Sequence, residues 1–252
     1  MIDPLWQFGI GTALTAAVAG VASYGTFVPG SRLWGPVVWR GTSENPPRVA
    51  LTFDDGPTAG STDRVLDLLG ELKVKAAFFV IGKNVERQPD LLERIDAEGH
   101  LVGNHTFDHW RWCSTQRGDY WREQIGRADA AIERVLGRRP VLFRPPIGHK
   151  TPYTMAAARE HGHAVVTWSV RAWDGMPTTP EKIVGHVLPR CDAGTIVVLH
   201  DGVEPTRPRD PRATIAAIRP LVAALRERGL APARLDEVVG LTAYAPPARK
   251  LE

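Results

Sequence analysis

The sequence predicts an α/β fold in which helices cover a parallel sheet. Short apolar segments alternate with longer amphipathic ones along the chain, which is the pattern of repeated strand and helix units. The segment 76–81 is apolar at every position, as expected for a strand that is buried on both faces of a parallel sheet. By these criteria, strands are expected at 49–53, 76–81, 141–143, 164–168 and 195–199.

The amphipathic segments between these strands are expected to form helices. In segment 119–136, apolar residues recur every three or four positions, Gly137 supplies a C-terminal stop, and Pro140 prevents continuation. Helices are expected at 63–72, 89–98, 119–136, 152–160, 180–188 and 213–228. Such alternation produces either an open doubly wound sheet or a closed β/α barrel, and in both the active site lies beyond the carboxyl ends of the strands.

The composition is that of a folded globular protein. The 252 residues are 43% hydrophobic and 23% charged, which is enough to bury a full core and excludes a disordered chain. The 31 Lys and Arg nearly balance the 28 Asp and Glu, and the arginines are scattered, so a nucleic-acid partner is not expected. Cys113 and Cys191 match no zinc-finger or redox spacing, and are expected as buried thiols or as one disulfide.

The N-terminal part differs from the rest of the chain. Residues 8–28 contain no charged side chain, and at about 1.5 Å per helical residue they just cross a hydrocarbon core of about 30 Å. This favours a membrane anchor or an uncleaved signal, although arginines follow the segment and none precedes it. We expect residues 1–45 to be this segment and a linker, and residues 46–252 to be one folded domain. A packed N-terminal helix of a soluble protein is the alternative.

Two adjacent carboxylates, Asp54 and Asp55, follow the first expected strand directly. Unpaired carboxylates that face one space of low dielectric constant repel each other, so this pair favours a cation or a proton as its partner. A turn with ordinary capping aspartates is the alternative, because Gly56 and Pro57 come next.

Two histidines, His105 and His109, lie four residues apart after another short apolar stretch. Two imidazoles and one carboxylate from elsewhere in the chain form a three-ligand metal site with an open position for water or substrate. Histidines at this spacing also occur in surface and capping positions. Five other histidines carry no such pattern and are expected to be structural: His100, His149, His161, His163 and His186.

Three further polar side chains follow expected strands. Arg144 comes after the strand at 141–143 and before two prolines that fix the backbone, so it is placed to orient a carboxylate and keep it ionised. Asp174 follows the strand at 164–168, and His200 ends the last one. Because an α/β fold gathers the carboxyl ends of its strands at one edge, we expect all five motifs to meet there.

Together these motifs, in this order, resemble the polysaccharide deacetylase family, the NodB homology domain of carbohydrate esterase family 4. The motifs span about residues 49–199, and the resemblance extends to the whole chain beyond Pro46. It implies a distorted (β/α) barrel with fewer than eight strands. It also implies a divalent metal, usually zinc, with cobalt, nickel and manganese as alternatives. With the uncharged segment 8–28, we expect a protein of the cell envelope, membrane-anchored or exported, and a soluble cytoplasmic protein is the alternative.

The resemblance assigns a role to each motif. Asp55, His105 and His109 would hold the metal, and Asp54 would be the general base, steadied by Arg144.

The same resemblance makes His200 the general acid, tuned by Asp174, and gives the backbone N–H of Ile147 the place of an oxyanion donor. The substrate-binding residues are expected to be Pro146, Ile147, Trp173 and Leu199. The chain departs from the family at Ile147, where an aromatic residue is usual. It also reads Arg-Ala-Trp-Asp-Gly at 171–175 in place of Asp-x-x-Asp-Trp, which leaves the metal centre intact but changes the wall that faces the sugar.

The chemistry of the motifs agrees with this assignment. A bound zinc-type ion polarises an amide carbonyl and lowers the pKa of its water towards about 7. We therefore expect a hydrolase that removes N-acetyl groups from N-acetylglucosamine-type residues of a polysaccharide or peptidoglycan. An O-acetyl esterase, a lipid-linked sugar deformylase and a non-catalytic glycan-binding module are the alternatives. A metal-dependent oxygenase also uses two histidines and a carboxylate, but needs neither Asp54 nor His200.

Overall fold

The sheet at the centre of the molecule is parallel. The computed structural model describes residues 4–42, 46–202, 204 and 210–246, and all pairings between its strands are parallel. Seven strands follow the order β5-β4-β3-β2-β1-β7-β6, and an eighth, β8, pairs with β1 outside this path. The strands are β1 (Arg48–Asp54), β2 (Ala77–Val80), β3 (Leu101–Asn104), β4 (Leu142–Phe143), β5 (Ala164–Val165), β6 (Val170–Arg171), β7 (Ile196–His200) and β8 (Ala231–Ala233).

The two edge strands of the seven are neighbours in the sequence. Only residues 166–169 join the end of β5 to the start of β6. Such a connection spans at most about 17 Å, whereas seven strands laid flat at about 4.8 Å spacing would be about 29 Å wide. The sheet must therefore curl until its edges approach each other. This confirms the expected distorted barrel, whose wall has fewer than eight strands.

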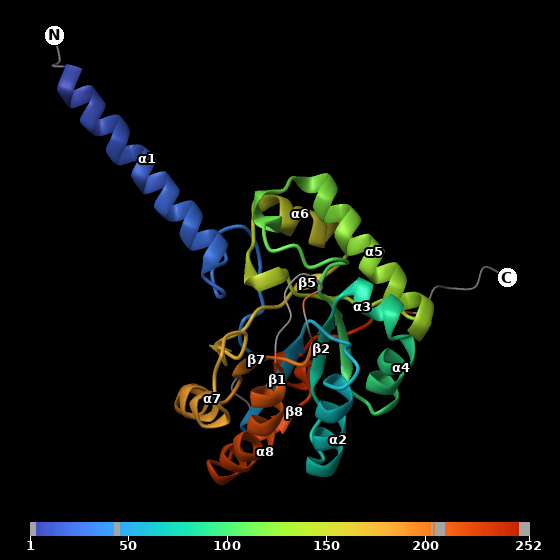
Figure 1. Cartoon of the computed structure of the whole chain (residues 1–252). Coiled ribbons are helices and arrows are strands. Elements are labelled where there is room, and N and C mark those ends of the chain that lie inside the picture. Colours follow the sequence, from blue (N-terminus) through green and yellow to red (C-terminus); the bar gives the residue numbers. More distant parts are fainter. Residues whose placement is uncertain (1–3, 43–45, 203, 205–209, 247–252) are drawn as a thin grey trace.

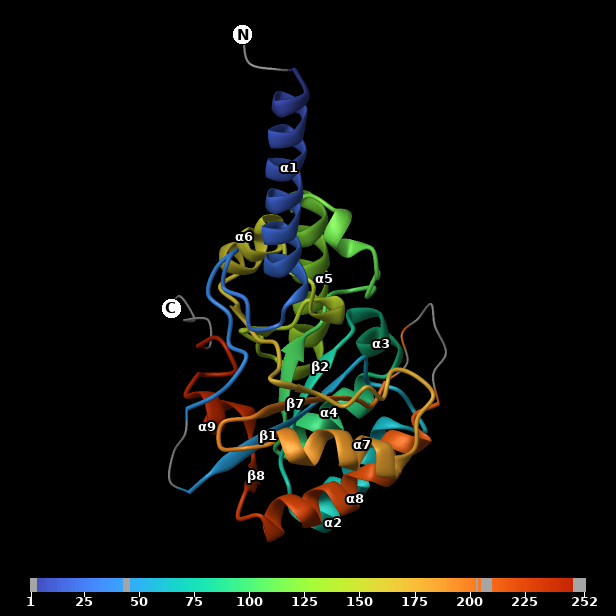
Figure 2. The same ribbon diagram turned by 90° about the vertical axis from the view of Figure 1, so that its left-hand side faces the viewer.

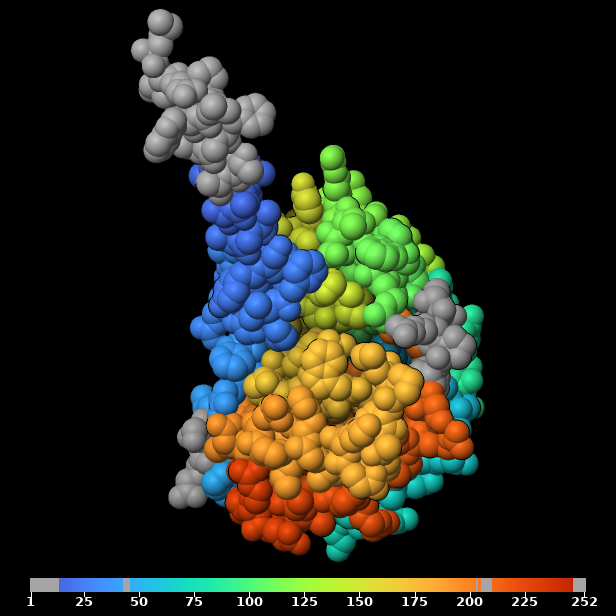
Figure 3. All heavy atoms as spheres, turned by 60° about the vertical axis from the view of Figure 1, so that its left-hand side comes forward, coloured from blue at the N-terminus to red at the C-terminus, as the bar shows by residue number. Residues whose placement is uncertain are grey.

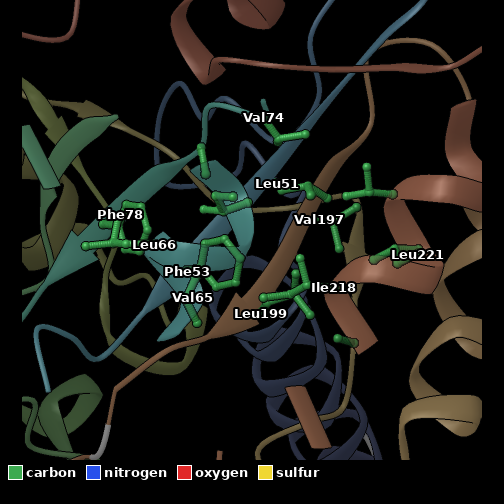
Figure 4. Close-up of a cluster of buried hydrophobic side chains, with 14 of the residues drawn as sticks. Leu51, Phe53, Val65, Leu66, Val74, Phe78, Val197, Leu199, Ile218 and Leu221 are labelled. Carbon is green, nitrogen blue, oxygen red and sulfur yellow. The ribbon is translucent and has the colours of Figure 1, made fainter. Parts of the chain in front are cut away.

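Helices cover the outside of the curled sheet (Figures 1 and 2). They are α2 (Thr62–Leu72), α3 (Gly82–Arg87), α4 (Pro89–Ala97), α5 (Gly118–Leu136), α6 (Pro152–Glu160), α7 (Pro180–Val187), α8 (Arg212–Glu227) and α9 (Leu235–Val239). Figure 4 shows the main core, in which Leu51, Phe53 and Leu199 of the sheet face helical side chains such as Leu66 and Leu221. All five are fully buried, and each such side chain stabilises the fold by about 1.5–3 kcal/mol.

The opposite face of the strands encloses a second core inside the curl. Because successive residues of a strand point to opposite faces, Ala50, Ile196 and Val198 lie in this inner core with Phe79 and Trp168. The sheet therefore separates an outer core beneath most of the helices from a second core, which includes the first residues of β2, β3, β4 and β7 and side chains of α9.

Most of the expected elements are present, with ends that differ by a residue or two. The exception is the strand expected at 164–168, which ends at Val165. Val166 and Thr167 cross between the edges of the sheet, and their carbonyl oxygens accept hydrogen bonds from the side chain of Arg144. The sequence analysis does not predict β3, β6, β8, α3 or α9. The helices α3 and α9 have only six and five residues, which is too short to show a helical period.

The uncharged N-terminal segment forms a long helix, α1 (Pro4–Phe27), that projects from the body of the molecule (Figures 1 and 2). The apolar side chains of Leu14, Val18, Val21 and Tyr24 are each more than half exposed. No helix within the described residues is long and apolar enough to cross a membrane. Membrane anchoring by residues 8–28 therefore stays a prediction.

The residues that follow α1 pack on the body. Val37 is buried, Val38 bridges to Val166, and Gly41 donates its amide to the carbonyl of Gly194 at 2.8 Å. The packed part of the molecule therefore includes residues that the sequence assigns to the linker.

Both cysteines are buried free thiols. Cys113 lies in the cluster beneath α5 and α6, and Cys191 lies in the outer core near α7 and α8. Of the two interpretations left open by the sequence, the structure shows the unpaired thiols.

His100 is a buried histidine of the core, as the sequence predicts. Its Nδ1 accepts a hydrogen bond from the amide of Ala76 at 3.1 Å, so the neutral ring carries its proton on Nε2. Burial is the main cause that lowers the pKa of His100 from 6.5 to about 4, and the charges of Lys75 and Arg94 act in the same direction.

We predict that protonation of His100 destabilises the fold in acid. A depressed histidine pKa contributes stability that is fully present above pH 6.5 and is lost as the pH falls towards 4. The full effect is about 3 kcal/mol, since one pH unit corresponds to about 1.4 kcal/mol. Urea unfolding between pH 7 and 4 should show a smaller loss in His100→Gln than in the native protein. An equal loss in both would contradict this role.

Candidate active site

The motif residues meet at the carboxyl ends of the strands. Asp54 ends β1 and lies opposite His200, the last residue of β7, in the parallel register of the two strands. Asn104 ends β3 and lies opposite Phe143 at the end of β4, so the loops with His105 and Arg144 start side by side. The rule for α/β folds thus places all five motifs around one space.

Asp55, His105 and His109 form a compact buried cluster. One ligand atom from each residue lies within 4.8 Å of the other two. Asp55 Oδ1 is 3.5 Å from His105 Nε2 and 3.3 Å from His109 Nε2. His105 Nδ1 lies 2.6 Å from the carbonyl oxygen of Arg144, which fixes the ring and directs Nε2 towards Asp55.

The surroundings of this cluster favour an ionised Asp55 and a neutral His109, which are the forms that bind a metal. Burial raises the pKa of Asp55, but the nearby imidazoles of His109 and His105 hold it well below its usual range. Burial lowers the pKa of His109. Burial also acts on His105, but Asp54 and Asp55 outweigh it and raise the pKa of that imidazole. A divalent cation would replace the proton between His105 and Asp55, so the donor set fits a metal ion with three protein ligands and an open position.

The backbone of the cluster is strained. Asp55, Thr106 and His109 have φ values of 75°, 67° and 53°, which residues other than glycine rarely adopt. The side chain of Asn104 supports this loop by accepting a hydrogen bond from the amide of Thr106 at 2.8 Å. Strain of this kind persists only where the surrounding structure imposes it, and it is concentrated at functional sites.

Gly202 allows the loop after β7 to approach Asp55 closely. A Cβ atom at Gly202 would lie 2.0 Å from the backbone carbon of Asp55, so a larger residue cannot be accommodated. Beside it, Asp201 is fully buried and receives a hydrogen bond from Thr62 at 2.5 Å. Burial is the main cause that raises the pKa of Asp201 to about 7, with the charge of Asp55 adding to it.

Arg144 holds the carboxylate of Asp54. Its Nη1 donates to Asp54 Oδ1 at 2.6 Å and to the hydroxyl of Thr52 at 2.9 Å. The other oxygen of Asp54, Oδ2, is 3.9 Å from His105 Nε2 and therefore faces the metal cluster. One carboxylate oxygen is thus fixed by an ion pair, and the second faces the cluster of residues that would hold a metal.

His200 forms a pair with Asp174. His200 Nδ1 is 2.7 Å from Asp174 Oδ1, and the amide of His200 donates to Oδ2 at 2.9 Å. Thr214 also donates to Oδ2, at 2.8 Å, and fixes the carboxylate. This arrangement sets the ring orientation, so that Nε2 is the nitrogen of His200 available to a substrate.

A cavity of about 210 Å³ connects these groups. It is lined by Asp54, Asp55, His105, His109, Arg111, Ile147, Trp168, Arg171, Trp173, Gly175, Met176, Val198, His200 and Glu204. Figure 3 shows the face on which the green segment before α5 lies beside the yellow and orange segment that includes Trp173. Trp173 is half exposed at the cavity rim, and its φ is 59°.

Two of the expected substrate-binding residues lie elsewhere. Leu199 is in the outer core beneath the helices (Figure 4), because it points to the opposite face from its neighbours Val198 and His200. Pro146 is buried behind the cavity wall and shapes the turn that carries Ile147. The expectation that Leu199 contacts substrate is therefore wrong, and Val198 takes its place.

Sequence reasoning missed an ion pair in the cavity wall. Arg111 Nη1 lies 2.7 Å from Glu204 Oε1, and Glu204 Oε2 lies 3.7 Å from His109 Nδ1. The pair joins the loop after His109 to the loop after His200. Proximity to the two motif histidines was a signal for each residue, but nothing local to either one indicates that they meet.

Comparison with known proteins identifies the family. The model of the polysaccharide deacetylase family matches residues 41–166. The chain belongs to this family. A peptidoglycan-N-acetylglucosamine deacetylase of Bacillus cereus is 36% identical over 199 residues, which are 77% of this chain and 89% of that protein. A second Bacillus cereus protein of the same name is 36% identical over 156 residues, and of its length the match spans 56%.

Other relatives agree with this assignment. A chitooligosaccharide deacetylase of Azorhizobium caulinodans is 34% identical over 75% of this chain and 93% of its own length. A crystal structure of a peptidoglycan N-acetylglucosamine deacetylase matches with a TM-score of 0.76 and 30% identity, over 82% of this chain and 94% of the other. This polysaccharide deacetylase is therefore similar to its relatives in both fold and sequence.

We predict that a metal-content assay distinguishes variants of the metal ligands from a variant of Asp54, the proposed base. Asp55→Asn and His105→Ala should lose bound metal and activity together, because each removes one of three ligands. Asp54→Asn should keep one metal per chain and lose turnover by about 10²–10⁴-fold, the usual contribution of a general base. Atomic emission measurements after dialysis, together with a rate assay, check this. A metal-free Asp54→Asn that still folds would overturn the division of roles between the two aspartates.

Proposed function

We propose that this chain is a metal-dependent hydrolase that removes acetyl groups from N-acetylglucosamine residues of peptidoglycan. The observation that carries the proposal is one cavity that holds the buried Asp55–His105–His109 cluster, an Arg144-bound carboxylate and an Asp174-bound imidazole. The names of the relatives support both the reaction and the sugar.

Zinc is the metal we propose. Two histidines and one carboxylate with an open position are typical of catalytic zinc, which polarises a carbonyl and acidifies its bound water. Cobalt, nickel or manganese at the same ligands would be the other outcomes of a metal analysis.

Asp54 is placed to act as the general base. Its Oδ1 is held by Arg144, and its Oδ2 faces the ligand cluster. Asp54 can therefore accept the proton of the attacking water as the bond to the amide carbon forms. The backbone N–H of Ile147, at the cavity wall, supplies a donor to the oxyanion that develops on the carbonyl oxygen.

His200 is placed to act as the general acid. An amine leaves an amide only when it receives a proton, and His200 Nε2 is the proton donor on the cavity side. Asp174 favours the charged imidazolium through direct electrostatic attraction and holds the ring through Nδ1. Proton removal by Asp54 and proton delivery by His200 thus come from neighbouring strands, β1 and β7.

Positive charge at the rim favours an anionic glycan over a neutral one. Arg111 and Arg171 both line the cavity, but the ion pair with Glu204 offsets the charge of Arg111. The Arg171 guanidinium stacks 4.6 Å from the ring centre of Trp173. Burial is the main cause that lowers the pKa of His149 to about 4, and Lys150, Arg111 and Arg171 lower it further, which shows that their charges act on one region. Peptidoglycan carries carboxylates next to its N-acetylglucosamine residues, whereas chitin oligomers are neutral.

The location follows from this substrate. We propose that the protein acts at the cell envelope, where peptidoglycan lies. The exposed and uncharged surface of α1 supports attachment there, with residues 8–28 at the membrane.

We predict acetate release that depends on metal. The full chain should release acetate from peptidoglycan, lose this activity with a chelator and regain it with added zinc. The measurement is enzymatic detection of acetate against a metal-loaded His200→Ala control, which should be inactive. Release of acetate only from O-acetylated glycan would favour the esterase alternative. A metal-loaded protein that releases nothing from any glycan would favour the binding module.

We predict that Arg171 contributes to the choice of glycan. Arg171→Gln should lower kcat/KM for peptidoglycan strands up to about fivefold, the effect of one partly exposed charge. The kcat/KM for neutral N-acetylglucosamine oligomers should stay within twofold. Arg226→Gln is the matched control, because Arg226 lies on α8 and donates to the carbonyl of Leu72, away from the cavity. Equal losses on both glycans would contradict charge recognition by Arg171.

A further inference from the structure

Lys150 is a fully buried lysine whose ammonium group contacts carbonyl oxygens at the end of α1. Its Nζ donates to the carbonyl of Val28 at 2.9 Å and to that of Pro29 at 3.2 Å. Burial lowers the pKa of Lys150 to about 8. The carboxyl end of a helix carries partial negative charge, so a cation there is stabilised by the helix dipole as well as by its hydrogen bonds.

Three more contacts belong to the same junction. The amide of Lys150 donates to the carbonyl of Thr26 at 3.1 Å, and Trp34 Nε1 donates to the Thr26 hydroxyl at 3.3 Å. The ring of Phe27 lies edge-on to that of His149, with centroids 4.6 Å apart. Figure 3 shows the blue end of α1 lying against yellow-green residues of this region. The residues at the end of α1 are therefore packed against residues 149 and 150 and hydrogen-bonded to Lys150 and Trp34.

The turn just before this junction carries the proposed oxyanion donor. Ile147 has a φ of 50°, which is unfavourable for a β-branched residue and must be imposed by its surroundings. On one side of Ile147, Gly148 packs so closely on Trp168 that a Cβ would lie 2.5 Å from the indole ring. Two residues further on, Lys150 fixes the chain to α1.

A second connection runs from α1 to the general base. The hydroxyl of Thr167 donates to the carbonyl of Pro29 at 2.9 Å, and the carbonyl of Thr167 accepts from Arg144 Nη2 at 3.0 Å. Arg144 in turn binds Asp54. The end of α1 therefore contacts both parts of the chain that position catalytic groups.

We propose that Lys150 is a positioning residue that fixes the 146–148 turn to the carboxyl end of α1 and thereby holds the Ile147 amide at the cavity. This inference rests on the proposed function, because the amide matters as a donor to a reacting carbonyl. The residues that supply the anchor, 26–29, precede the part of the chain that the family model matches, 41–166. Both the contacts of Lys150 and the matched range thus leave residues 26–29 as a separate segment that precedes the matched region.

The first test compares the hydrolysis of two substrates, one N-acetylated and one N-trifluoroacetylated, by the full chain loaded with metal. Lys150→Met keeps the length of the side chain and removes its donors. It should lower kcat for N-acetyl substrate at least about tenfold, part of the loss seen when an oxyanion donor is removed. An N-trifluoroacetyl substrate has a more electrophilic carbonyl and should lose less than threefold. KM and metal content should stay within twofold, and Lys75→Met, which loses a bond to the carbonyl of Glu98, should match the native protein.

The second test does not need activity. Backbone hydrogen exchange should become faster at residues 147–150 and 26–28 in Lys150→Met, while the amides of β1 and β2 keep their protection. Thr167→Val, which removes one hydroxyl from the same junction, should produce a smaller effect of the same kind. Equal losses of kcat on both substrates, or hydrogen exchange that becomes faster throughout the chain, would overturn the proposal. If the native protein deacetylates nothing, the proposed function fails, and the exchange data still decide whether Lys150 fixes the turn.

Discussion

The ion pair between Arg144 and Asp54 is the interaction on which both the curled sheet and the active site depend. A fully buried guanidinium is costly unless its donors are satisfied, and those of Arg144 reach Asp54, Thr52 and the carbonyls of residues 166 and 167. The last two belong to the connection between β5 and β6, where the sheet lacks a strand. The same side chain therefore fills the gap in the barrel and fixes the carboxylate of Asp54.

This arrangement also explains how the metal cluster is oriented. The carbonyl of Arg144 lies next to His105 Nδ1, so the residue that binds Asp54 through its side chain holds a member of the Asp55–His105–His109 cluster through its backbone. Removal of the guanidinium would leave Asp54 buried without its partner and would also disturb the 166–167 connection. A loss of activity in such a variant would accordingly mix catalysis with folding.

The local motifs were predictable because each consists of polar side chains close to an apolar strand in the sequence. Asp54, His105 and His200 each follow an apolar strand, and the α/β rule brings strand ends together without knowledge of any contact. Leu199 was misassigned because a one-residue shift along a strand changes the face, and only the register decides it. The Arg111–Glu204 pair and the contact of Lys150 with Val28 could not be predicted, since the partners lie 93 and 122 residues apart and neither is part of a periodic pattern.

The central strand β1 pairs with β2, which is nearby in the sequence, and with β7 and β8, which are far away. It pairs with β2 through residues such as Phe53 and Phe78, but its other edge pairs with β7, which is synthesised much later. The hydroxyl of Thr52 donates to the carbonyl of Val197, which is 145 residues further along the chain. At a synthesis rate of about 5–20 residues per second, that edge stays open for roughly 7–30 s on the ribosome. An apolar strand with an open edge is prone to pair with other chains. Newly made chains therefore pass through a vulnerable period, which ends only when β7 emerges and brings His200 beside Asp54.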